Sequence, residues 1–369
     1  MQAPYSIALA GGGTGGHLVP GLHILRRLVE RGSAPGSVLW FGAGRAVEDR
    51  VLAGLDEAVA GARTERITLH LEPPGGGAPS LAGLLARTPG SVLAARRALR
   101  RHQSGLLLGL GGFTTLPAVL AARTLGIPVF LLEINAVPGR ATRHLAPLAT
   151  RVFHAWPSTL PADPGLRHLH VGPPLAPEFL GGPPTPALSR AARGGLGFDP
   201  DRPLVVVLGG SQGALGLNRF LREHAAVLVE EGVQVLHQCG PGRGAEGPAP
   251  APGLRVVEYL DDVPRALSAA TLVLSRGGAS TLAELAALAR PTLVVPYPHH
   301  ADRHQERNAR LLGEGVRIVP EESLDAGFAA ELVRLASPSG DSERAAMERA
   351  LAGKVPSDAS ERIARELAG

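Results

Sequence analysis

Three glycine-rich loops and one acidic helix carry the residues that could do chemistry in this chain. The loops are GGGTGGH at 11–17, GLGGFTT at 109–115 and GGSQGA at 209–214, and each follows an apolar, strand-like run. Glycine lets backbone N–H groups approach an anion closely, and a helix that begins at such a loop favours negative charge. Loops of this kind predict phosphate binding, and a purely structural turn is the alternative for each one.

The segment LSRGGASTLAELAALARPTLVVPYPHHADRHQERNA, residues 274–309, is the most informative stretch. A strand is expected to end at Ser275, and a helix is expected from Ala279 to Ala289. Backbone N–H groups at that helix start can hold a diphosphate without a metal. Glu284 lies one turn further along, where its carboxylate can accept two hydrogen bonds from ribose hydroxyls. A solvated helix carboxylate without a ligand is the alternative for Glu284.

The first loop also satisfies the dinucleotide-binding fingerprint, because Gly11, Gly13 and Gly16 form G-x-G-x-x-G. A nicotinamide enzyme needs in addition an acidic residue at the end of the second strand. The sequence there is VLWFGAGRAVED, in which no acid occupies that place. Arg45 could meet a 2′-phosphate, so NADP is weakened rather than excluded. No cofactor is expected, and no metal either, because backbone N–H groups at glycine-rich loops and helix starts can hold a diphosphate without one.

Alternating strands and helices must position these loops, and the sequence predicts this alternation twice. In the first half, strands are expected near 5–10, 37–42, 105–110, 128–133, 151–155 and 168–171, with helices at 91–103 and 114–126. A stretch with six prolines between 173 and 186 predicts a linker. The pattern then restarts with RPLVVVLGGSQGALGLNRFL, and further strands are expected at 233–238, 254–258, 271–275, 291–296 and 316–319.

The expected fold is therefore α/β, with two Rossmann-like, doubly wound domains facing each other across a cleft. The domains are expected at 1–172 and 173–355, and residues 356–369 are expected to form a C-terminal helix that packs back on the first domain. Ligands bind at the carboxyl ends of the strands in such sheets. The loops should therefore line the cleft.

Composition limits the class of protein. The 369 residues are 44% hydrophobic and 19% charged, which is typical of a globular protein. A single cysteine, Cys239, excludes an internal disulfide and fits a reducing compartment. The sequence has neither signal-peptide features at its start nor an apolar run long enough to span a bilayer, so a cytoplasmic location is expected.

Positive charge is concentrated in the first half. Residues 1–170 carry 17 Arg against 9 acidic residues, whereas residues 171–369 carry 20 basic against 24 acidic residues. An anionic membrane surface or an anionic substrate suits this distribution. Nucleic acid is not expected, since only 4% of residues are aromatic and no nucleic-acid-binding motif is present.

Taken in order, several motifs resemble the MurG family of UDP-GlcNAc-dependent glycosyltransferases over nearly the whole chain. They are GGGTGGHLVPGL, LGIPVFLLEINAVPGRATRHLAPLATRVFHAWP, LGGSQGALGLN, YLDDVPRALSAATLVLSRGGASTLAEL and DRHQERNA. The resemblance implies the glycosyltransferase-B fold and inverting transfer of GlcNAc from UDP-GlcNAc to the 4-hydroxyl of lipid-linked MurNAc-pentapeptide, which converts lipid I to lipid II in peptidoglycan synthesis. It also implies an undecaprenyl-pyrophosphoryl-MurNAc-pentapeptide acceptor and a peripheral location at the cytoplasmic face of the inner membrane.

The resemblance also implies roles for individual residues. The C-terminal domain holds UDP-GlcNAc and the N-terminal domain holds the lipid acceptor. The implied substrate-binding residues are Thr14, Gly15 and Gly16 in the acceptor loop, Asn135 at a GlcNAc hydroxyl, Ser211, Gln212 and Gly213 near the diphosphate, Ala279, Ser280 and Thr281 at the helix start, Glu284 at the ribose, and His304 and Gln305 near the sugar.

Three departures from the family pattern stand out. Phe113 replaces a common tyrosine in the second loop, and Ala176 replaces a common phosphate-contacting arginine. The family's HEQN appears as LEIN, which keeps Glu133 and Asn135.

The attacking hydroxyl needs a base, and His17 is the first choice because an unperturbed histidine titrates near neutral pH. Glu133, which the resemblance places at the acceptor site, is the second choice. A His17 that only hydrogen-bonds phosphate or backbone is the alternative. The segment 81–102 places Leu81, Leu84 and Leu85 beside a helix that carries Arg96, Arg97, Arg100 and Arg101. This pattern predicts docking on an anionic membrane, and an ordinary solvated face is the alternative.

Three other functions stay open on the sequence. A different UDP-sugar glycolipid glycosyltransferase and a UDP-GlcNAc 2-epimerase would share the fold. A membrane-surface adaptor on an inactive transferase scaffold would share the fold without the activity.

Overall fold

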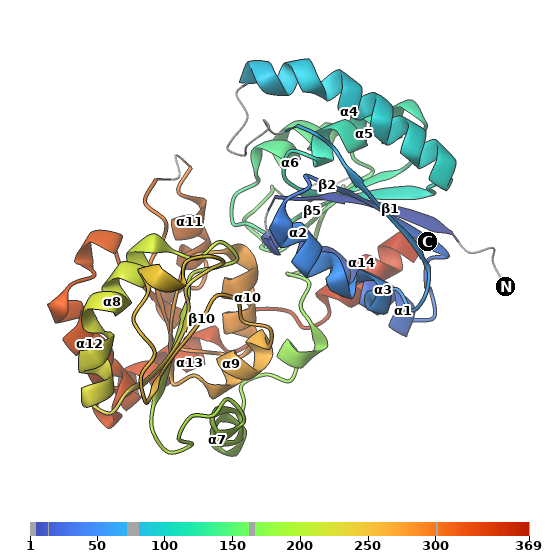
Figure 1. Cartoon of the computed structure of the whole chain (residues 1–369). Coiled ribbons are helices and arrows are strands. Elements are labelled where there is room, and N and C mark those ends of the chain that lie inside the picture. Colours follow the sequence, from blue (N-terminus) through green and yellow to red (C-terminus); the bar gives the residue numbers. More distant parts are fainter. Residues whose placement is uncertain (1–4, 14, 72–80, 162–166, 300–301, 369) are drawn as a thin grey trace. The chain divides into compact units, whose positions relative to one another are not determined.

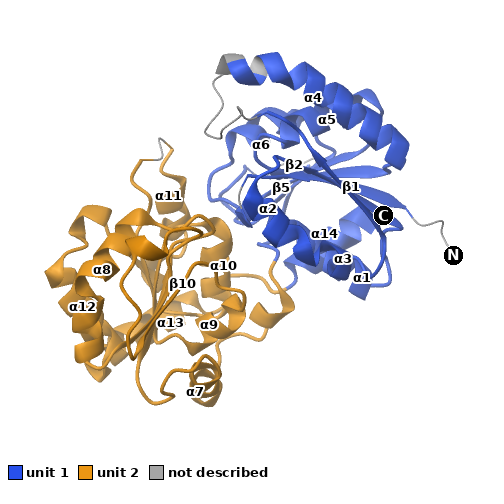
Figure 2. Cartoon of the chain, viewed as in Figure 1, with its two compact units in different colours: residues 1–174, 358–369 blue, residues 175–357 orange. Residues whose placement is uncertain are grey.

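The computed structural model describes residues 5–13, 15–71, 81–161, 167–299 and 302–368. The chain divides into two compact units, coloured separately in Figure 2. Unit 1 consists of Met1–Pro174 and Asp358–Gly369, and unit 2 consists of Leu175–Ser357. The boundaries expected from the sequence, at 172 and 355, lie two residues earlier.

Unit 1 is built on a parallel sheet with strand order β3-β2-β1-β4-β5-β6-β7. The strands are β1 (Ser6–Gly11), β2 (Ser37–Gly42), β3 (Arg63–Thr68), β4 (Leu106–Gly111), β5 (Val129–Glu133), β6 (Arg151–His154) and β7 (His168–His170). In register, Ala8 of β1 pairs with Leu39 on one side and Leu107 on the other. The strand order reverses between β1 and β4, so the expected ligand position is at the carboxyl ends of these two strands.

Helices cover both faces of this sheet (Figure 1). They are α1 (Gly15–Glu30), α2 (Ala46–Val51), α3 (Leu55–Ala58), α4 (Leu81–His102), α5 (Thr115–Thr124), α6 (Arg140–Leu145) and α14 (Ala359–Ala368). On one face, α4, α5 and α6 enclose a core that includes Phe41, Leu99 and Val119. On the other face, α14 packs beside α1, where Glu361 accepts a hydrogen bond from Arg27 Nε at 2.6 Å and pairs with Arg31.

Unit 2 repeats this architecture with strand order β10-β9-β8-β11-β12-β13, again all parallel. The strands are β8 (Leu204–Leu208), β9 (Gln234–Gln238), β10 (Leu254–Val257), β11 (Leu272–Ser275), β12 (Thr292–Val294) and β13 (Val316–Ile318). The helices are α7 (Pro186–Gly195), α8 (Leu215–Glu230), α9 (Val263–Ala269), α10 (Ala279–Ala287), α11 (His304–Arg310), α12 (Ala326–Ala336) and α13 (Asp341–Leu351). The order reverses between β8 and β11, which places the third glycine-rich loop and the start of α10 at the switch point.

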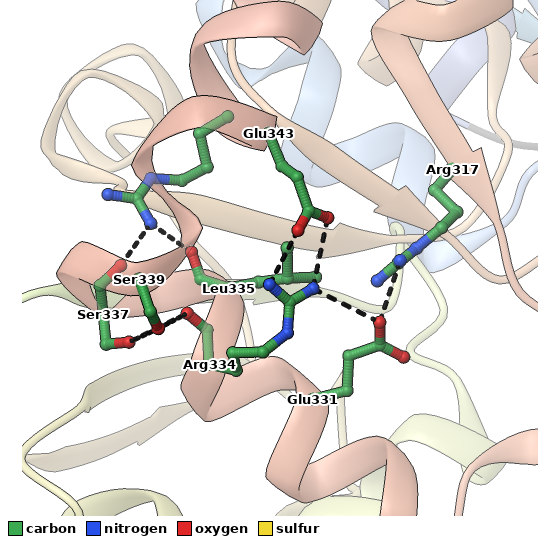
Figure 3. Close-up of polar contacts among 8 residues, drawn as sticks. Arg317, Glu331, Arg334, Leu335, Ser337, Ser339 and Glu343 are labelled. Atoms are coloured by element: carbon green, nitrogen blue, oxygen red, sulfur yellow. Dashed lines mark hydrogen bonds and ion pairs between the residues drawn. The ribbon is translucent and has the colours of Figure 1, made fainter.

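A charged cluster joins α12 to α13 and to β13 (Figure 3). Arg334 donates to Glu343 through its two terminal guanidinium nitrogens, at 2.7 and 3.1 Å. It also lies 3.7 Å from a carboxylate oxygen of Glu331. Arg317 pairs with Glu331 at 2.9 Å. These side chains are about two-fifths exposed and satisfy one another, so we assign the cluster a structural role.

The predicted strands are confirmed to within a residue or two, and the α/β class with two parallel sheets is confirmed. Strand β3 was not predicted, because RTERIT is an edge strand with no buried face and therefore shows no apolar pattern. Helix α4 begins ten residues before the expected start and continues through Pro89. None of the helices in the described part of the chain is both long and apolar enough to cross a bilayer.

The stretch at 173–186, predicted to be a linker, contains the boundary between the two units, which falls between Pro174 and Leu175. Most of residues 177–185 are exposed, but the stretch begins in buried chain and ends in a helix. Residues 171–176 are buried, and α7 begins at Pro186. Thr185 caps that helix, since its side chain accepts a hydrogen bond from the Leu188 N–H at 3.3 Å. Proline is favoured at the first helical position because it lacks an N–H that the helix would leave unpaired there.

Candidate active site

In unit 1, the first glycine-rich loop brings His17 to the carboxyl end of β1. Gly15 and Gly16 open α1, and His17 follows in its first turn; Thr14 lies outside the described residues. The His17 Nδ1 atom lies 3.3 Å from the Gly12 carbonyl oxygen. A carbonyl can only accept, so Nδ1 donates this hydrogen bond. In the neutral imidazole the lone pair is therefore on Nε2.

The second glycine-rich loop packs against the His17 ring. Gly111 and Gly112 have φ angles of +102° and +79°, which favour glycine. A Cβ atom at Gly111 would lie 3.2 Å from His17 Nε2, and one at Gly112 would lie 2.9 Å from the Gly12 oxygen. Two of the three loops noticed in the sequence therefore meet at this histidine. Phe113, the next residue, is 47% exposed.

Glu133 and Asn135 form a hydrogen-bonded pair at the carboxyl end of β5, the strand next to β4. Glu133 is only 5% exposed. Its Oε1 accepts from the backbone N–H of Asn135 at 3.0 Å and from Asn135 Nδ2 at 2.8 Å. Its Oε2 accepts from the Gly139 N–H at 2.8 Å and from Thr142 Oγ1 at 2.6 Å. A carboxylate has about four acceptor positions, so this geometry favours positioning of Asn135 by Glu133 over proton abstraction.

Glu48 lies against the first glycine-rich loop and was not singled out from the sequence. It lies in α2 and is 2% exposed, and its carboxylate accepts from the Gly13, Ala43 and Gly44 N–H groups. Arg45 donates to the Gly13 carbonyl oxygen at 3.1 Å. A side chain of the protein thus uses the Gly13 N–H that a dinucleotide phosphate would need. In the sequence, Glu48 stands four residues after Gly-Ala-Gly, and this spacing does not by itself distinguish it from a surface acid.

In unit 2, Ser211 and Gln212 occupy the corner of a turn after β8. The turn is closed by a hydrogen bond from the Gly213 N–H to the Gly210 carbonyl at 2.9 Å, and Gln238 Nε2 donates to the same carbonyl at 3.1 Å. Gly213, with φ of +72°, presses against the Cys239 carbonyl, where a Cβ would collide. Gly213 therefore shapes the turn, while Ser211 is partly exposed and Gln212 is exposed.

The start of α10 presents a polar stripe on an otherwise buried helix. Ala279, Leu282 and Leu285 are buried, whereas Ser280, Thr281 and Glu284 are partly exposed. Helical spacing of three and four residues places Glu284 on the face of Ser280 and Thr281, and side chains lean toward the helix N-terminus. The first-turn N–H groups of this helix make no intrahelical hydrogen bond. These N–H groups point out of the N-terminal end of α10, toward which the side chains of the polar stripe also lean.

The Glu284 side chain is partly exposed, but protein atoms crowd around its carboxyl group. This desolvation raises the pKa of Glu284 to about 8. Within the described part of the chain, no side chain or backbone N–H donates to it. A carboxyl group whose pKa is raised in this way marks a candidate functional site. Donors from a ligand would satisfy the oxygens that the protein leaves without partners.

Gln305 and Asn308 hold the loop that precedes α10. Gln305 Oε1 accepts from the Tyr297 N–H at 2.9 Å and from the Gly277 N–H at 3.3 Å, and Asn308 Nδ2 donates to the Gly277 carbonyl at 3.1 Å. His304 Nδ1 lies 2.8 Å from Asp302 Oδ1. Gln305 thus brings β12 and α10 together, with its amide nitrogen left to donate. Asn308, which is 2% exposed, was missed although it lies one turn beyond Gln305.

No group of three or more His, Cys, Asp or Glu side chains among the described residues is arranged to hold a metal ion. Each unit has a parallel sheet with a glycine-rich loop at its switch point, a histidine in unit 1 and a desolvated carboxyl group in unit 2. These features fit a glycosyltransferase that uses a nucleotide-sugar donor.

Comparison with known proteins identifies the family. Residues 7–154 match the glycosyltransferase family 28 N-terminal domain, and residues 204–362 match the glycosyltransferase family 28 C-terminal domain. The chain belongs to the UDP-N-acetylglucosamine--N-acetylmuramyl-(pentapeptide) pyrophosphoryl-undecaprenol N-acetylglucosamine transferase family, as its motifs predicted.

Two relatives and one solved structure illustrate the match. The relative from Parasynechococcus marenigrum is 36% identical over 93% of this chain and 94% of its own length. The one from Sorangium cellulosum is 38% identical over 98% and 87%. The crystal structure of Acinetobacter baumannii MurG has a TM-score of 0.69 and 25% identity, and covers 99% of both chains.

Proposed function

We propose that this chain transfers GlcNAc from UDP-GlcNAc to the 4-hydroxyl of lipid-linked MurNAc-pentapeptide, with inversion at the anomeric carbon. The observation that carries the proposal is the position of Glu284 one turn inside α10, on the same face as Ser280 and Thr281, with no donor to its carboxyl group among the described residues. Ribose hydroxyls supply the donors that this carboxyl lacks. The relatives' names, which specify the same donor and acceptor, support the choice.

Unit 2 binds the nucleotide-sugar. The N–H groups of Ala279, Ser280 and Thr281 contact the diphosphate, and Ser211 contacts it from the turn after β8. Negative charge that develops on the leaving UDP is stabilised by these preorganised donors and by the helix dipole. Gln305 and His304 lie beside the sugar, where the Gln305 amide nitrogen can donate to a hydroxyl. No cofactor takes part in this proposal.

Unit 1 binds the acceptor and supplies the base. His17 Nε2 takes the proton of the acceptor 4-hydroxyl as that oxygen attacks the anomeric carbon. The bond from the anomeric carbon to the β-phosphate oxygen breaks, and UDP leaves with the electron pair. Support for this role comes from the Nδ1 contact to the Gly12 carbonyl, which leaves the lone pair on Nε2. Asn135, oriented by Glu133, contacts a GlcNAc hydroxyl.

The lipid-linked acceptor requires the chain to work at the cytoplasmic face of the inner membrane as a peripheral protein. Helix α4 supports this location with Leu93, which is 53% exposed, and with the exposed side chains of Arg97 and Arg100. The structure assigns fewer arginines to this basic face than the four expected from the sequence. Arg96 donates to Thr124 Oγ1 at 3.0 Å and Arg101 pairs with Glu65, so these two arginines also have partners within unit 1.

One assay tests the proposal: UDP release from UDP-GlcNAc with and without a lipid-linked muramyl-peptide acceptor. Release that requires the acceptor, with a disaccharide product, supports it. Conversion of UDP-GlcNAc without acceptor would indicate an epimerase, and release with a different glycolipid acceptor would indicate another transferase. Absence of UDP binding would indicate a non-enzymatic adaptor.

The Glu284→Ala variant tests the nucleotide site by calorimetry. Hydrogen bonds to a charged group contribute about 1.5–3 kcal/mol, so UDP affinity should fall at least about tenfold. Unchanged affinity in a folded variant would remove Glu284 from the site.

A further inference from the structure

We propose that Glu48 is a positioning residue that fixes the proton-accepting form of His17 through a single peptide group. The inference rests on the proposed role of His17 as the base. It adds a residue that neither the motifs nor the expected substrate contacts had singled out.

The Glu48 carboxylate occupies the first glycine-rich loop as an internal anion. It accepts from the Gly13 N–H at 2.7 Å and from the Ala43 and Gly44 N–H groups at 3.0 Å. A Cβ at Gly12 would lie 2.7 Å from Oε1, and one at Gly42 would collide with Oε2. The glycines here make room for a carboxylate of the chain itself. The Gly13 N–H is consequently used within unit 1 and is not a donor for substrate phosphate.

The Gly13 N–H and the Gly12 carbonyl belong to the same planar peptide group. In a trans peptide they point in opposite directions. Glu48 accepts from the nitrogen side of this group, and its oxygen side accepts from His17 Nδ1 at 3.3 Å. The hydrogen bonds therefore run in one series from the imidazole through the peptide to the carboxylate. Such a series is cooperative, because each bond polarises the next.

Arg45 holds the peptide that follows. It donates to the Gly13 carbonyl at 3.1 Å, so both the N–H and the C=O of Gly13 are bound by side chains at the start of α2. Gly13 has φ of +87°. Glycine adopts positive and negative φ about equally readily, so without further contacts the peptide group between Gly12 and Gly13 could rotate. The two contacts oppose such a rotation. If the Gly12 carbonyl turned away, His17 Nδ1 would lose its acceptor, and the tautomer with the lone pair on Nε2 would lose its preference.

Glu48→Gln is the central test, because an amide has one acceptor oxygen for three converging N–H groups. We expect kcat to fall at least about tenfold while KM for UDP-GlcNAc stays unchanged, since the nucleotide site lies in unit 2. In ligand-free protein, ¹⁵N spectra of histidine, assigned with His17→Gln, should show His17 moving from the Nδ1–H toward the Nε2–H tautomer. Glu361→Gln is the matched control: it removes a carboxylate bound by arginines in unit 1 and should leave both readouts unchanged.

Glu48→Ala provides a second test by chemical rescue. The substitution empties a space lined by three N–H donors, and added formate should restore kcat saturably without affecting the wild-type protein. A Glu48→Gln protein with kcat within twofold of wild type and an unchanged His17 tautomer would overturn the proposal. If His17→Ala has normal turnover, the base assignment fails, whereas the ligand-free spectra still decide whether Glu48 fixes the His17 ring.

Discussion

The side-chain amide of Asn135 donates to Glu133 Oε1 over 2.8 Å, and the Asn135 backbone N–H donates to the same oxygen over 3.0 Å. The other carboxylate oxygen is used by Gly139 and Thr142. Proton abstraction by Glu133 would require one of these hydrogen bonds to break. Glu133 therefore fixes the amide of Asn135 and the loop that leads into α6.

Glu133→Gln should destabilise unit 1 and lower activity indirectly. The amide cannot accept from all four donors, and leaving a buried donor unsatisfied costs about 1–3 kcal/mol. We expect a lower midpoint of urea unfolding and a reduced kcat, with the pH profile of kcat/KM keeping the position of its acidic limb. Loss of that limb in the variant would instead make Glu133 the base.

His17→Ala should lower kcat by about 10²–10⁴, the usual contribution of a general base. UDP affinity should change little, because the proposed nucleotide site lies in unit 2. Steady-state kinetics and calorimetry on the same preparation separate these quantities. His168→Ala, which removes a partly exposed histidine from edge strand β7, is the control and should retain activity. A His17→Ala protein with near-normal kcat would refute the assignment.

Glu284 should make the ligand-free protein less stable as pH rises. The unfolded chain releases the Glu284 proton near pH 4.5, the ordinary glutamate pKa, whereas the folded state keeps it until about pH 8. Between these two pH values the folded state binds one more proton than the unfolded state. The stability of wild type should therefore fall across this window relative to Glu284→Gln. Since one pKa unit corresponds to about 1.4 kcal/mol, we expect the variant to be more stable by at least that amount at pH 8.

Glu343→Gln is the control of opposite sign for this experiment. The hydrogen bond from Arg334 lowers the pKa of Glu343, so its carboxylate contributes stability above the ordinary glutamate pKa that is lost as pH falls (Figure 3). The Glu343→Gln variant should be the less stable protein at pH 7. Denaturant unfolding at several pH values measures both variants. A pH-independent difference between Glu284→Gln and wild type would contradict the desolvated state of Glu284.

The sequence predicted the central strands well because strands buried on both faces read as continuous apolar runs. It also predicted the loops at their ends, since glycine-rich segments directly follow those runs. Contacts between residues far apart in the chain could not be predicted from the sequence. Glu48 meets a peptide 35 residues earlier in the chain, and nothing in the local pattern AVEDR distinguishes it from a surface acid. Glu133 was found, but its four hydrogen bonds, which favour positioning over catalysis, come from the fold.

Membrane docking should depend on two arginines of α4 rather than on the four that the sequence grouped together. Arg97 and Arg100 are exposed and make no ion pair within the described part of the chain, and Leu93 lies one turn before Arg97 on the same face. Each such arginine near anionic lipid contributes about 1 kcal/mol. Arg97→Glu with Arg100→Glu should therefore weaken co-sedimentation with phosphatidylglycerol vesicles by at least about tenfold.

A charge-matched control separates this site from net charge alone. Arg219→Glu with Arg222→Glu makes the same change at the same spacing on the exposed face of α8 in unit 2, and should bind vesicles nearly as well as wild type. Binding of the wild type should fall as salt rises, because surface charges are screened. Turnover of a soluble short-chain acceptor should persist in both double variants, since neither touches the site residues. Equal vesicle binding by the two double variants would show that α4 is not the docking face.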